Sequence, residues 1–428
     1  MGAADVTDNP QNAPRRDDDP TSRELGELIF QSATRLLSLL FPQQVDLRFF
    51  PNYAIFPFES ENRFEWYYLP ASLIPRSGLP LRAMNPTQQQ AALELLQQSL
   101  SATGFQKANN IRMLELVLHE IEKNLANPFR RDAEAYHFTI FGTPSKTGAW
   151  GWRYEGHHTS LHWTMIDGEV ISSTPQFFGA SPATVTLDVH GGPPLGTRVL
   201  GAEEDLAREL ILSLTEDQRP EAILLGPDPQ DILTLNQRRA SIQESRGISY
   251  AAMRPPQRDL LQRLVRTYAD VQPGPIARDR MLRIEKAGWD GVRFAWTGSR
   301  EMGRLHYYRI ILINSFLIEY DTPMGEPFHR HTVWRDFLGD WGQDRITSFA
   351  RVSAPAPPFA PAIGDWGHSW GPDLLRQHYL TSHHHNSCAQ GDSDHRYRTG
   401  DHGNGSQNEN SHGSRDQAEN VAFKREGK

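Results

Sequence analysis

Hydrophobic residues recur every three or four positions along several stretches of the chain, and this spacing predicts amphipathic α-helices. The first covers residues 21–41, with Thr21 or Ser22 as its N-cap. The second begins at residue 85 and ends at Gly104, a residue type that commonly terminates helices. Further helices of this kind are expected over residues 105–125, 202–218, 254–270 and 277–288.

Elsewhere, apolar and aromatic residues alternate or cluster in short runs, which is typical of β-strands. Residues 47–58 and 63–70 are expected to be short aromatic strands broken by proline, and Asp167 with Gly168 predicts a hairpin turn. The pattern as a whole predicts an α+β fold, in which an antiparallel or mixed sheet built from two strand runs is packed with amphipathic helices. The two runs comprise residues 135–142, 150–156, 157–168 and 169–179, and then residues 291–298, 305–314, 315–321 and 328–336.

The two ends of the chain differ from this pattern. Residues 1–20 are rich in proline, asparagine and charge, and residues 381–428 are polar and rich in histidine, asparagine and glycine. Such segments cannot bury enough apolar surface to fold, so both should be disordered. A single domain is therefore expected over residues 21–380. Because several of the 17 histidines lie in the tail, the total overstates any metal-binding signal.

Charge and cysteine content narrow the class of protein. Asp and Glu number 52 against 44 Lys and Arg, giving a net charge of −8 and no electrostatic reason to expect nucleic acid or an anionic membrane as a partner. No apolar run approaches the roughly 18 residues needed to span a bilayer. The single cysteine, Cys388, excludes disulfides within the chain and zinc–thiolate clusters. We therefore expect a soluble, cytoplasmic protein that acts on a small molecule, and its oligomeric state stays open.

The clearest chemical signal lies in the strand predicted over residues 328–336. His329 and His331 are two residues apart, so in a strand they share a face. The preceding strand ends with Glu319 and Asp321, which also share a face. If the strands pair, two carboxylates lie across from two imidazoles, a grouping that suits a divalent metal. The alternative is a polar rim in which the carboxylates accept imidazole N–H bonds, and the metal interpretation is somewhat favoured.

A second concentration of histidine lies in residues 154–163, YEGHHTSLHW, within a predicted strand. His157 and His158 are adjacent, so only one of them can face a given side of a regular strand. Either His157 or His158 could complete a metal site with the two histidines of the strand over residues 328–336. The other of the two would then lie behind the site and support it. Taken alone, each histidine is more readily explained as a hydrogen-bonded strand residue, and His162 is the weakest candidate.

Charged residues near these segments could bind a substrate. Arg153 and Arg309 lie in aromatic-rich strands, where an unpaired guanidinium would be costly. With Glu155 they could recognise a substrate, the arginines through its carboxylate or phosphate. An ion pair with Glu155, Glu319 or another buried carboxylate explains them at least as well. Gly179 is interpreted as a turn residue.

Several of these segments together resemble one known family. The segments are WGWRYEGHHTSL, TPQFFGASPATV, the AEEDLA helix with Gln218, FAWTG, YYRI, LIEYD and the run H-x-H-x-x-W-R-D. They resemble the DUF3500 family, a domain of unknown function, in the family's order and over most of residues 25–380. The resemblance implies no known activity. The family's recognisable marks are GHH, EYD and HRHTVWRD, and the spacing argument selects the same segments.

The resemblance is interrupted near the end of the domain. The family's ending resembles W-R-D, then D-x-G-x-D-x-L, then H-Y, whereas here a proline-rich stretch intervenes. Residues 345–372 are therefore expected to be an insertion, since a loop of this length is uncommon inside a domain. It is either a real insertion or untranslated sequence carried into the gene model. The interruption disturbs the spacing of Asp340, Asp344 and His378. Asp336 precedes it and is kept as a candidate catalytic residue.

The sequence thus predicts a metal-dependent enzyme. The two histidines of H-x-H, with His157 or His158, would bind one divalent ion (zinc, iron, copper or manganese), and Glu319 or Asp321 would be a fourth ligand or a general base. Hydrolysis is slightly favoured, because such an ion lowers the pKa of a bound water toward about 7. An iron- or copper-dependent oxidoreductase could use the same donors. The rivals are a non-catalytic protein that binds a small molecule and a metal-free enzyme with a Glu–His pair.

Overall fold

The computed structural model describes residues 20–45, 53–123, 131–226, 229–242, 245–323 and 327–349, all within one compact unit of the chain. The predicted disordered tail and nearly all of the predicted disordered N-terminus lie outside these ranges. Of the predicted insertion, residues 350–372 lie outside them as well. Its first five residues belong to helix α9 (Gln343–Phe349).

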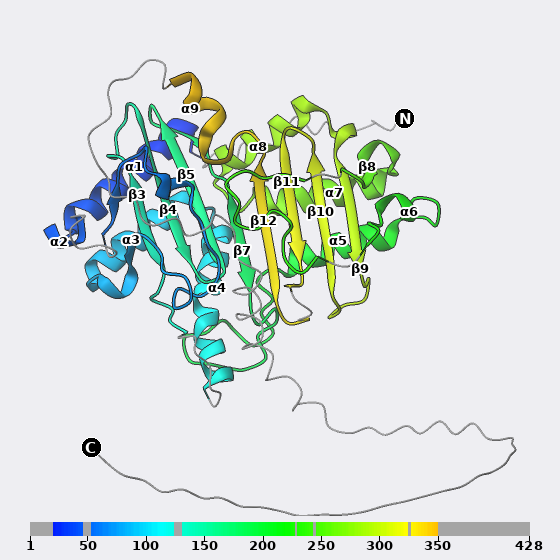
Figure 1. Cartoon of the computed structure of the whole chain (residues 1–428), viewed down its shortest axis with the longest axis horizontal. Helices are drawn as coiled ribbons and strands as arrows, with labels where there is room; N and C mark the ends of the chain where they lie inside the picture. The colour runs from blue at the N-terminus through cyan, green and yellow to red at the C-terminus, as the bar shows by residue number, and fades with distance from the viewer. Residues whose placement is uncertain are drawn as a thin grey trace, which may run out of the picture. The chain divides into compact units, whose positions relative to one another are not determined.

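A mixed sheet of twelve strands stands at the centre of the described residues. Its strands follow the order β1-β3-β4-β5-β7-β12-β11-β10-β9-β8, with β2 beside β3 and β6 beside β5. Among these strands β1 and β3 pair in parallel, and the two predicted strand runs meet where β7 pairs with β12 (Figure 1). The strands are β1 (Ile55–Phe56), β2 (Leu79–Pro80), β3 (His137–Phe141), β4 (Ala149–Gly156), β5 (Thr159–Ile166), β6 (Glu169–Ser172), β7 (Gln176–Ala180), β8 (Ile248–Ser249), β9 (Arg293–Gly298), β10 (His306–Leu312), β11 (Phe316–Asp321) and β12 (Arg330–Asp336).

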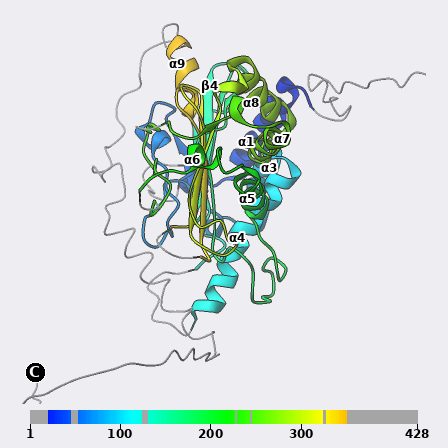
Figure 2. The ribbon, with the colours of Figure 1, turned by 90° about the vertical axis from the view of Figure 1, so that its right-hand side faces the viewer.

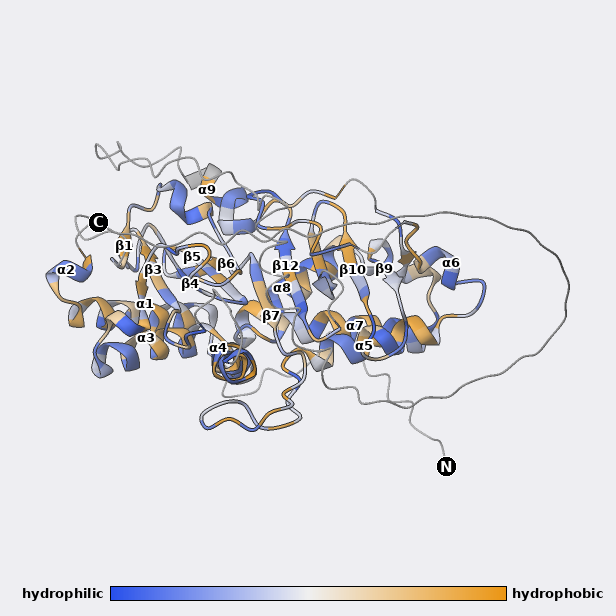
Figure 3. Ribbon diagram, turned by 60° about the horizontal axis from the view of Figure 1, so that its bottom comes forward, coloured by the Kyte–Doolittle hydropathy of each residue, from blue (hydrophilic) through white to orange (hydrophobic). Residues whose placement is uncertain are grey.

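The principal helices gather on one face of this sheet, as Figure 2 shows from the side. They carry both hydrophobic and hydrophilic positions (Figure 3), as amphipathic helices that pack on a sheet do. The predicted α+β architecture is therefore confirmed. The helices are α1 (Ser22–Leu39), α2 (Pro42–Val45), α3 (Pro86–Ser99), α4 (Ala102–Glu122), α5 (Gly201–Ser213), α6 (Arg219–Ala222), α7 (Pro255–Ala269), α8 (Gly274–Ala287) and α9.

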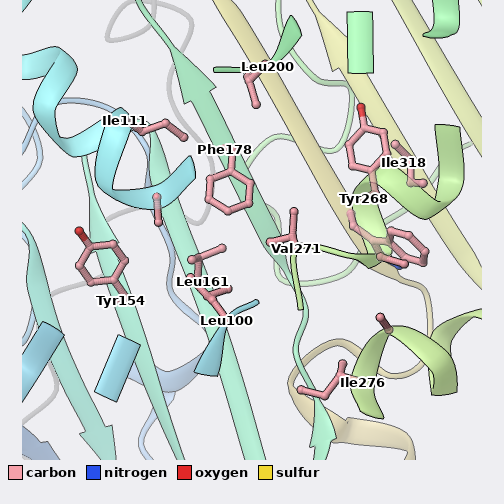
Figure 4. Packing of buried hydrophobic residues seen from close by; sticks show 14 of the residues in the cluster. Leu100, Ile111, Tyr154, Leu161, Phe178, Leu200, Tyr268, Val271, Ile276 and Ile318 are labelled. Carbon is pink, nitrogen blue, oxygen red and sulfur yellow. The ribbon is translucent and has the colours of Figure 1, made fainter. Parts of the chain in front are cut away.

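The main hydrophobic core lies between the sheet and these helices. Figure 4 shows Leu161 of β5, Phe178 of β7 and Ile318 of β11 beside Ile111 of α4 and Tyr268 of α7. All five side chains are at most 2% exposed. Burial of such side chains contributes about 1.5–3 kcal/mol each, so this layer fixes the position of every strand.

Irregular segments cover the opposite face. Trp66, Tyr68 and Ile232 pack there against Phe177 of β7 and Val333 of β12 in a second, smaller core. The sequence predicted a strand over residues 63–70, and this prediction was wrong. The segment instead leaves a short 3₁₀ turn, and its aromatic residues Trp66 and Tyr68 pack on the face of the sheet against Phe177 and Val333. This loop-covered face carries most of the candidate site residues.

The predicted start of the first helix is confirmed, whereas the predicted end of the second helix is wrong. Thr21 caps α1 in a reciprocal capping box with Glu24, as the pattern predicted. The second helix was predicted to reach Gly104, but α3 ends at Ser99 and Gly104 lies in the first turn of α4. A Cβ at this glycine would meet the backbone oxygen of Val271, so it serves close packing and not termination.

The turn between β5 and β6 was predicted correctly, whereas the strand predicted after it was not. Asp167 and Gly168 form the expected hairpin turn between β5 and β6, and both have positive φ. The single strand predicted over residues 169–179 is divided into β6 and β7. No helix among the described residues is long and apolar enough to cross a membrane.

Candidate functional site

The adjacent histidines of YEGHHTSLHW form the turn between β4 and β5. Gly156 pairs with Thr159, so His157 and His158 are the two-residue connection of a hairpin. The sequence pattern predicted that both lie inside a strand, and this was wrong because the chain reverses between β4 and β5. The rule that adjacent residues face opposite sides therefore does not apply, and the two imidazole rings stack with centroids 3.8 Å apart.

His158 adopts a backbone conformation that is uncommon outside glycine, with φ of 61°. Hydrogen bonds hold it there: its N–H donates to the carbonyl oxygen of Tyr68 at 2.8 Å, and its own carbonyl accepts from the N–H of Gly179 at 2.7 Å. Such conformations persist where surrounding structure imposes them, and they gather at functional sites. The turn is therefore a rigid support that presents the His158 ring to the sheet.

Strand β12 brings the next histidines to the same place. His331 lies opposite Asp321 of β11 on one side and Gly179 of β7 on the other. The expected pairing of β11 with β12 is thus present. Glu319, however, lies opposite Val333 and not opposite a histidine. His329 immediately precedes the strand.

Gly179 creates the space in which two imidazole rings meet. It lies inside β7, so its assignment to a turn was wrong. A Cβ at Gly179 would lie 2.8 Å from Cδ2 of His158 and 3.0 Å from Cδ2 of His331. Real Cβ atoms essentially never approach this closely, so the absent side chain is what admits both rings.

The result is a cluster of three buried imidazoles, His158, His329 and His331, whose nitrogens lie within 4.8 Å of one another. Nε2 of His158 is 2.7 Å from Nε2 of His329. Each ring is at most 2% exposed. Burial, reinforced by the neighbouring His331, holds the pKa of His329 well below its usual range. A neutral imidazole at pH 7 is the form that binds a metal.

Asp231 orients the central imidazole, and sequence reasoning missed it. Its Oδ1 accepts a hydrogen bond from Nδ1 of His331 at 2.8 Å, and its Oδ2 accepts one from the Tyr68 hydroxyl at 2.9 Å. This fixes the His331 tautomer so that Nε2 carries the lone pair, as carboxylates behind metal-bound histidines do. Asp231 lies in a loop without periodicity, so only the folded structure reveals it.

Asp321 supplies a buried carboxyl group that receives no hydrogen bond from the described residues. Its oxygens lie within 4.8 Å of the ligand atoms of Asp231 and His331. Both oxygens are buried and accept no hydrogen bond from any described residue. Burial, with the nearby charges of Asp231 and Glu319, raises the pKa of Asp321 well above its usual range. A buried carboxyl in this condition is either protonated or neutralised by a cation.

Glu319, two residues earlier on the same strand, is in a different situation. Its carboxylate accepts hydrogen bonds from the backbone N–H groups of Leu233 (2.6 Å) and Thr234 (3.2 Å). The hydroxyls of Thr234 (2.5 Å) and Tyr307 (3.0 Å) donate to it as well. Because its acceptor positions are used, Glu319 anchors the loop that carries Asp231, and we do not include it among the proposed ligands.

His157 stands behind the cluster. Its Nδ1 is hydrogen-bonded to Glu115 of α4, and its ring stacks on His158. Burial raises the pKa of Glu115 to about 7, against the opposing charge of Arg131. Arg131 in turn is paired with Glu122 at 2.7 Å. His157 therefore supports His158, and it is not among the three histidines whose ligand atoms lie within 4.8 Å of one another.

The remaining candidates lie in other parts of the structure. Arg153 is beside Glu155, with Nε 3.5 Å from Oε2, and its Nη1 donates to backbone carbonyls, including that of Asn62. Glu155 also accepts from the N–H of Tyr67 at 2.6 Å. This is the ion-pair arrangement that the sequence left open as the alternative to substrate binding.

Three further residues are likewise outside the cluster. Arg309 donates to the carbonyl oxygen of Arg246 at 3.2 Å. Asp336 lies at the far end of β12 and pairs with Arg283 at 3.3 Å. His162 is hydrogen-bonded through both ring nitrogens, to Ser160 and to Trp341.

The fold and the site define a mixed-sheet protein with a histidine and aspartate cluster on the loop-covered face of the sheet. A family model described as "Protein of unknown function (DUF3500)" matches residues 24–343 of the 428-residue chain. The chain therefore belongs to this family. The comparison with curated proteins and the comparison with solved structures each found no match.

Proposed function

We propose that this protein binds one divalent transition-metal ion through His158, His329, His331 and Asp321. The observation that carries the proposal is the convergence of three buried imidazoles, from a hairpin turn and from the segment that leads into and includes β12, within 4.8 Å of one another. The buried Asp321 carboxyl, whose oxygens accept no hydrogen bond from any described residue, supplies the negative charge that a bound cation would neutralise. Asp231 would hold His331 in the ligating tautomer.

The proposed ligands, three histidines and one aspartate, are of the types that predominate around catalytic metal ions. Structural zinc sites are usually rich in cysteine, whereas histidine and carboxylate donors predominate at catalytic ones. An ion held there would lower the pKa of a bound water toward about 7 and favour hydrolysis of a small molecule. Iron or copper in the same donor set would instead support oxidoreductase chemistry. A net charge of −8 argues against nucleic acid as substrate, and a chain with one cysteine suits the reducing cytoplasm.

Burial favours a second candidate function. The four proposed ligands are each at most 2% exposed. Four protein ligands that close the coordination sphere are typical of a structural metal, which contributes folding free energy without chemistry. In this case metal removal would lower the unfolding temperature, and no hydrolytic or oxidative activity would follow metal content.

Elemental analysis of the purified full chain tests the proposal. The expected result is close to one equivalent of zinc, iron, copper or manganese per chain, lost in His331→Gln and in His329→Gln. His162→Gln is the matched control, because it removes a buried imidazole on the same sheet outside the cluster. Simultaneous replacement of His383, His384 and His385 by alanine controls for the histidine-rich tail.

Each outcome decides a specific point. Absence of stoichiometric metal from the wild-type chain, after reconstitution with each of the four ions, would sink the proposal. Metal lost only on replacement of the three tail histidines would assign it to the tail. If zinc is bound, hydrolysis of ester and amide substrates should be lost on chelation and restored by zinc, and the structural candidate predicts no such activity. Iron or copper would direct the assay to oxygen consumption.

A further inference from the structure

A second site lies at the opposite end of β12, where a pocket of about 170 Å³ opens between the β10–β11 turn and helix α8. Its lining includes Asp336, which the sequence selected as catalytic. Asp336 follows His331 by five residues along the strand, which places it roughly 16 Å away at ~3.3 Å per residue. The pocket is therefore separate from the histidine cluster and needs its own explanation.

Arg280 of α8 is the principal charged group in its wall. The side chain is 3% exposed and its guanidinium lies over the Trp334 ring, 4.7 Å from the centroid. Nη1 donates to Oε1 of Gln176 at 2.9 Å, and Nη2 donates to the carbonyl oxygen and hydroxyl of Ser173 at 2.9 and 2.8 Å. These contacts fix the orientation of the guanidinium before any ligand arrives.

No carboxylate among the described residues forms an ion pair with this guanidinium. Several other buried arginines are paired with a carboxylate, as Arg335 is with Asp340 at 2.7 Å. An arginine has five N–H donors, and the contacts with Gln176 and Ser173 leave the Nε donor and one Nη1 donor of Arg280 without a partner among the described residues. Burial, with Arg283 nearby, lowers the pKa of Arg280 only to about 9, so the group is cationic at neutral pH. The carboxylates of Asp336, Asp279 and Asp340 favour this charge without forming an ion pair with it. A buried charge without an ion pair is costly unless a counter-ion joins it.

The rest of the lining is suited to an oxyanion. Thr174 and Ser315 bring hydroxyl groups to the pocket. The Asp336 carboxylate is already held by other groups, because Arg283 pairs with its Oδ2 and the N–H groups of Leu338 and Gly339 donate to its Oδ1. Asp344 is the second carboxyl in the lining, and burial together with Asp336 raises its pKa, which reduces its repulsion of an anion.

We propose that this pocket binds a small oxyanion, a carboxylate or a phosphate, through the guanidinium of Arg280 and the neighbouring hydroxyls. The proposal does not depend on the metal centre. It predicts a ligand whose negatively charged group enters the pocket and accepts the remaining N–H donors of Arg280. Charged hydrogen bonds of this kind determine whether such a ligand is retained.

The test is calorimetric titration of the full chain with inorganic phosphate and, separately, with succinate. We expect saturable binding of at least one, weakened by about tenfold or more in Arg280→Gln, since the substitution removes the charged hydrogen-bond donors of the site. Lys286→Gln is the matched control, because Lys286 is an exposed cation on the same helix and does not line the pocket. It removes the same charge and should leave binding unchanged.

Further variants keep the test decisive if Arg280→Gln fails to fold. Ser315→Ala, at a half-buried position, should weaken binding severalfold, and Asp344→Asn should strengthen it by removing a nearby carboxylate. Binding of succinate alone identifies a carboxylate ligand, and binding of phosphate alone identifies a phosphate. Failure of both probes to bind the wild-type chain would overturn the proposal. Equal weakening by Lys286→Gln would also overturn it, because the effect would then be one of overall charge.

Discussion

Gly179 and His158 are so close that a side chain on the first would overlap the ring of the second: a Cβ on Gly179 would lie 2.8 Å from Cδ2 of His158. The same position would lie 3.0 Å from His331. The Gly179 N–H also donates to the His158 carbonyl oxygen at 2.7 Å. One strand residue therefore both fixes the hairpin turn and leaves room for the imidazoles of two other segments.

Gly179→Ala should displace both rings and damage the metal centre. We expect a loss of ~1–3 kcal/mol in the free energy of unfolding, as for other overpacked interiors, with metal content falling well below one equivalent. Denaturant unfolding and elemental analysis measure the two effects. Gly148→Ala is the control: its φ is 77° but no atom lies within 4 Å of the new Cβ, so it should cost stability through backbone strain and retain metal. Full metal occupancy in Gly179→Ala would contradict the assigned geometry.

Asp231→Asn should weaken metal binding without removing a proposed ligand. The uncharged amide no longer raises the basicity of His331 as a carboxylate partner does, and loss of such a partner typically lowers metal affinity 10–100-fold. Competition with a chelator of known affinity measures the change. Tyr68→Phe removes only the hydroxyl that donates to Asp231, so a smaller decrease is expected. An unchanged affinity in Asp231→Asn would mean that Asp231 does not support His331 as a metal ligand.

The carboxylates of Asp321 and Glu319 should respond in opposite ways to conversion into amides. Glu319→Gln places an amide among four hydrogen-bond donors and should destabilise the protein by ~2–3 kcal/mol while metal is retained. Asp321→Asn replaces a buried carboxyl without breaking a hydrogen bond to any described residue, so it should not destabilise the metal-free protein. It should abolish stoichiometric metal. Measurements of unfolding and metal content on both variants compare these effects, and metal loss restricted to Glu319→Gln would reverse the assignment.

The sequence predicted the fold more completely than the candidate site. Periodicity placed α1, α5, α7 and α8 and the strands of both runs, because each of these elements buries one face against a common core. Pairing of β11 with β12 followed from the short connection, and it put Asp321 opposite His331. These features depend on spacing along a single segment, and spacing is what a sequence displays directly.

Other features required the folded chain. His157 and His158 were assigned to a strand, since a two-residue hairpin without Asn or Gly at its turn carries no local signal. Asp231 was missed because its importance comes from a contact 100 residues away in sequence, with His331. Gly179 was assigned to a turn, although tertiary packing of two rings explains it. Long-range contacts of irregular segments are not encoded in any local pattern.

Glu204 of α5 should make part of the stability depend on pH in the acid range. Burial by itself would raise the pKa of Glu204, but the charge and hydrogen bonds of Arg330, with those of Arg208, lower it from 4.5 to about 2. A carboxylate with a lowered folded-state pKa contributes stability that is fully present above the unfolded pKa and is lost as the pH falls through the folded one. This contribution, ~3 kcal/mol by linkage, should therefore disappear between about pH 4.5 and pH 2.

Glu204→Gln should be less stable at pH 7 and should lose this pH dependence, which denaturant unfolding at successive pH values measures. Glu209→Gln, at an exposed position on the same helix, should unfold with the wild-type pH dependence. A Glu204→Gln curve that runs parallel to wild type through this window would show that the carboxylate is not ion-paired in the folded chain.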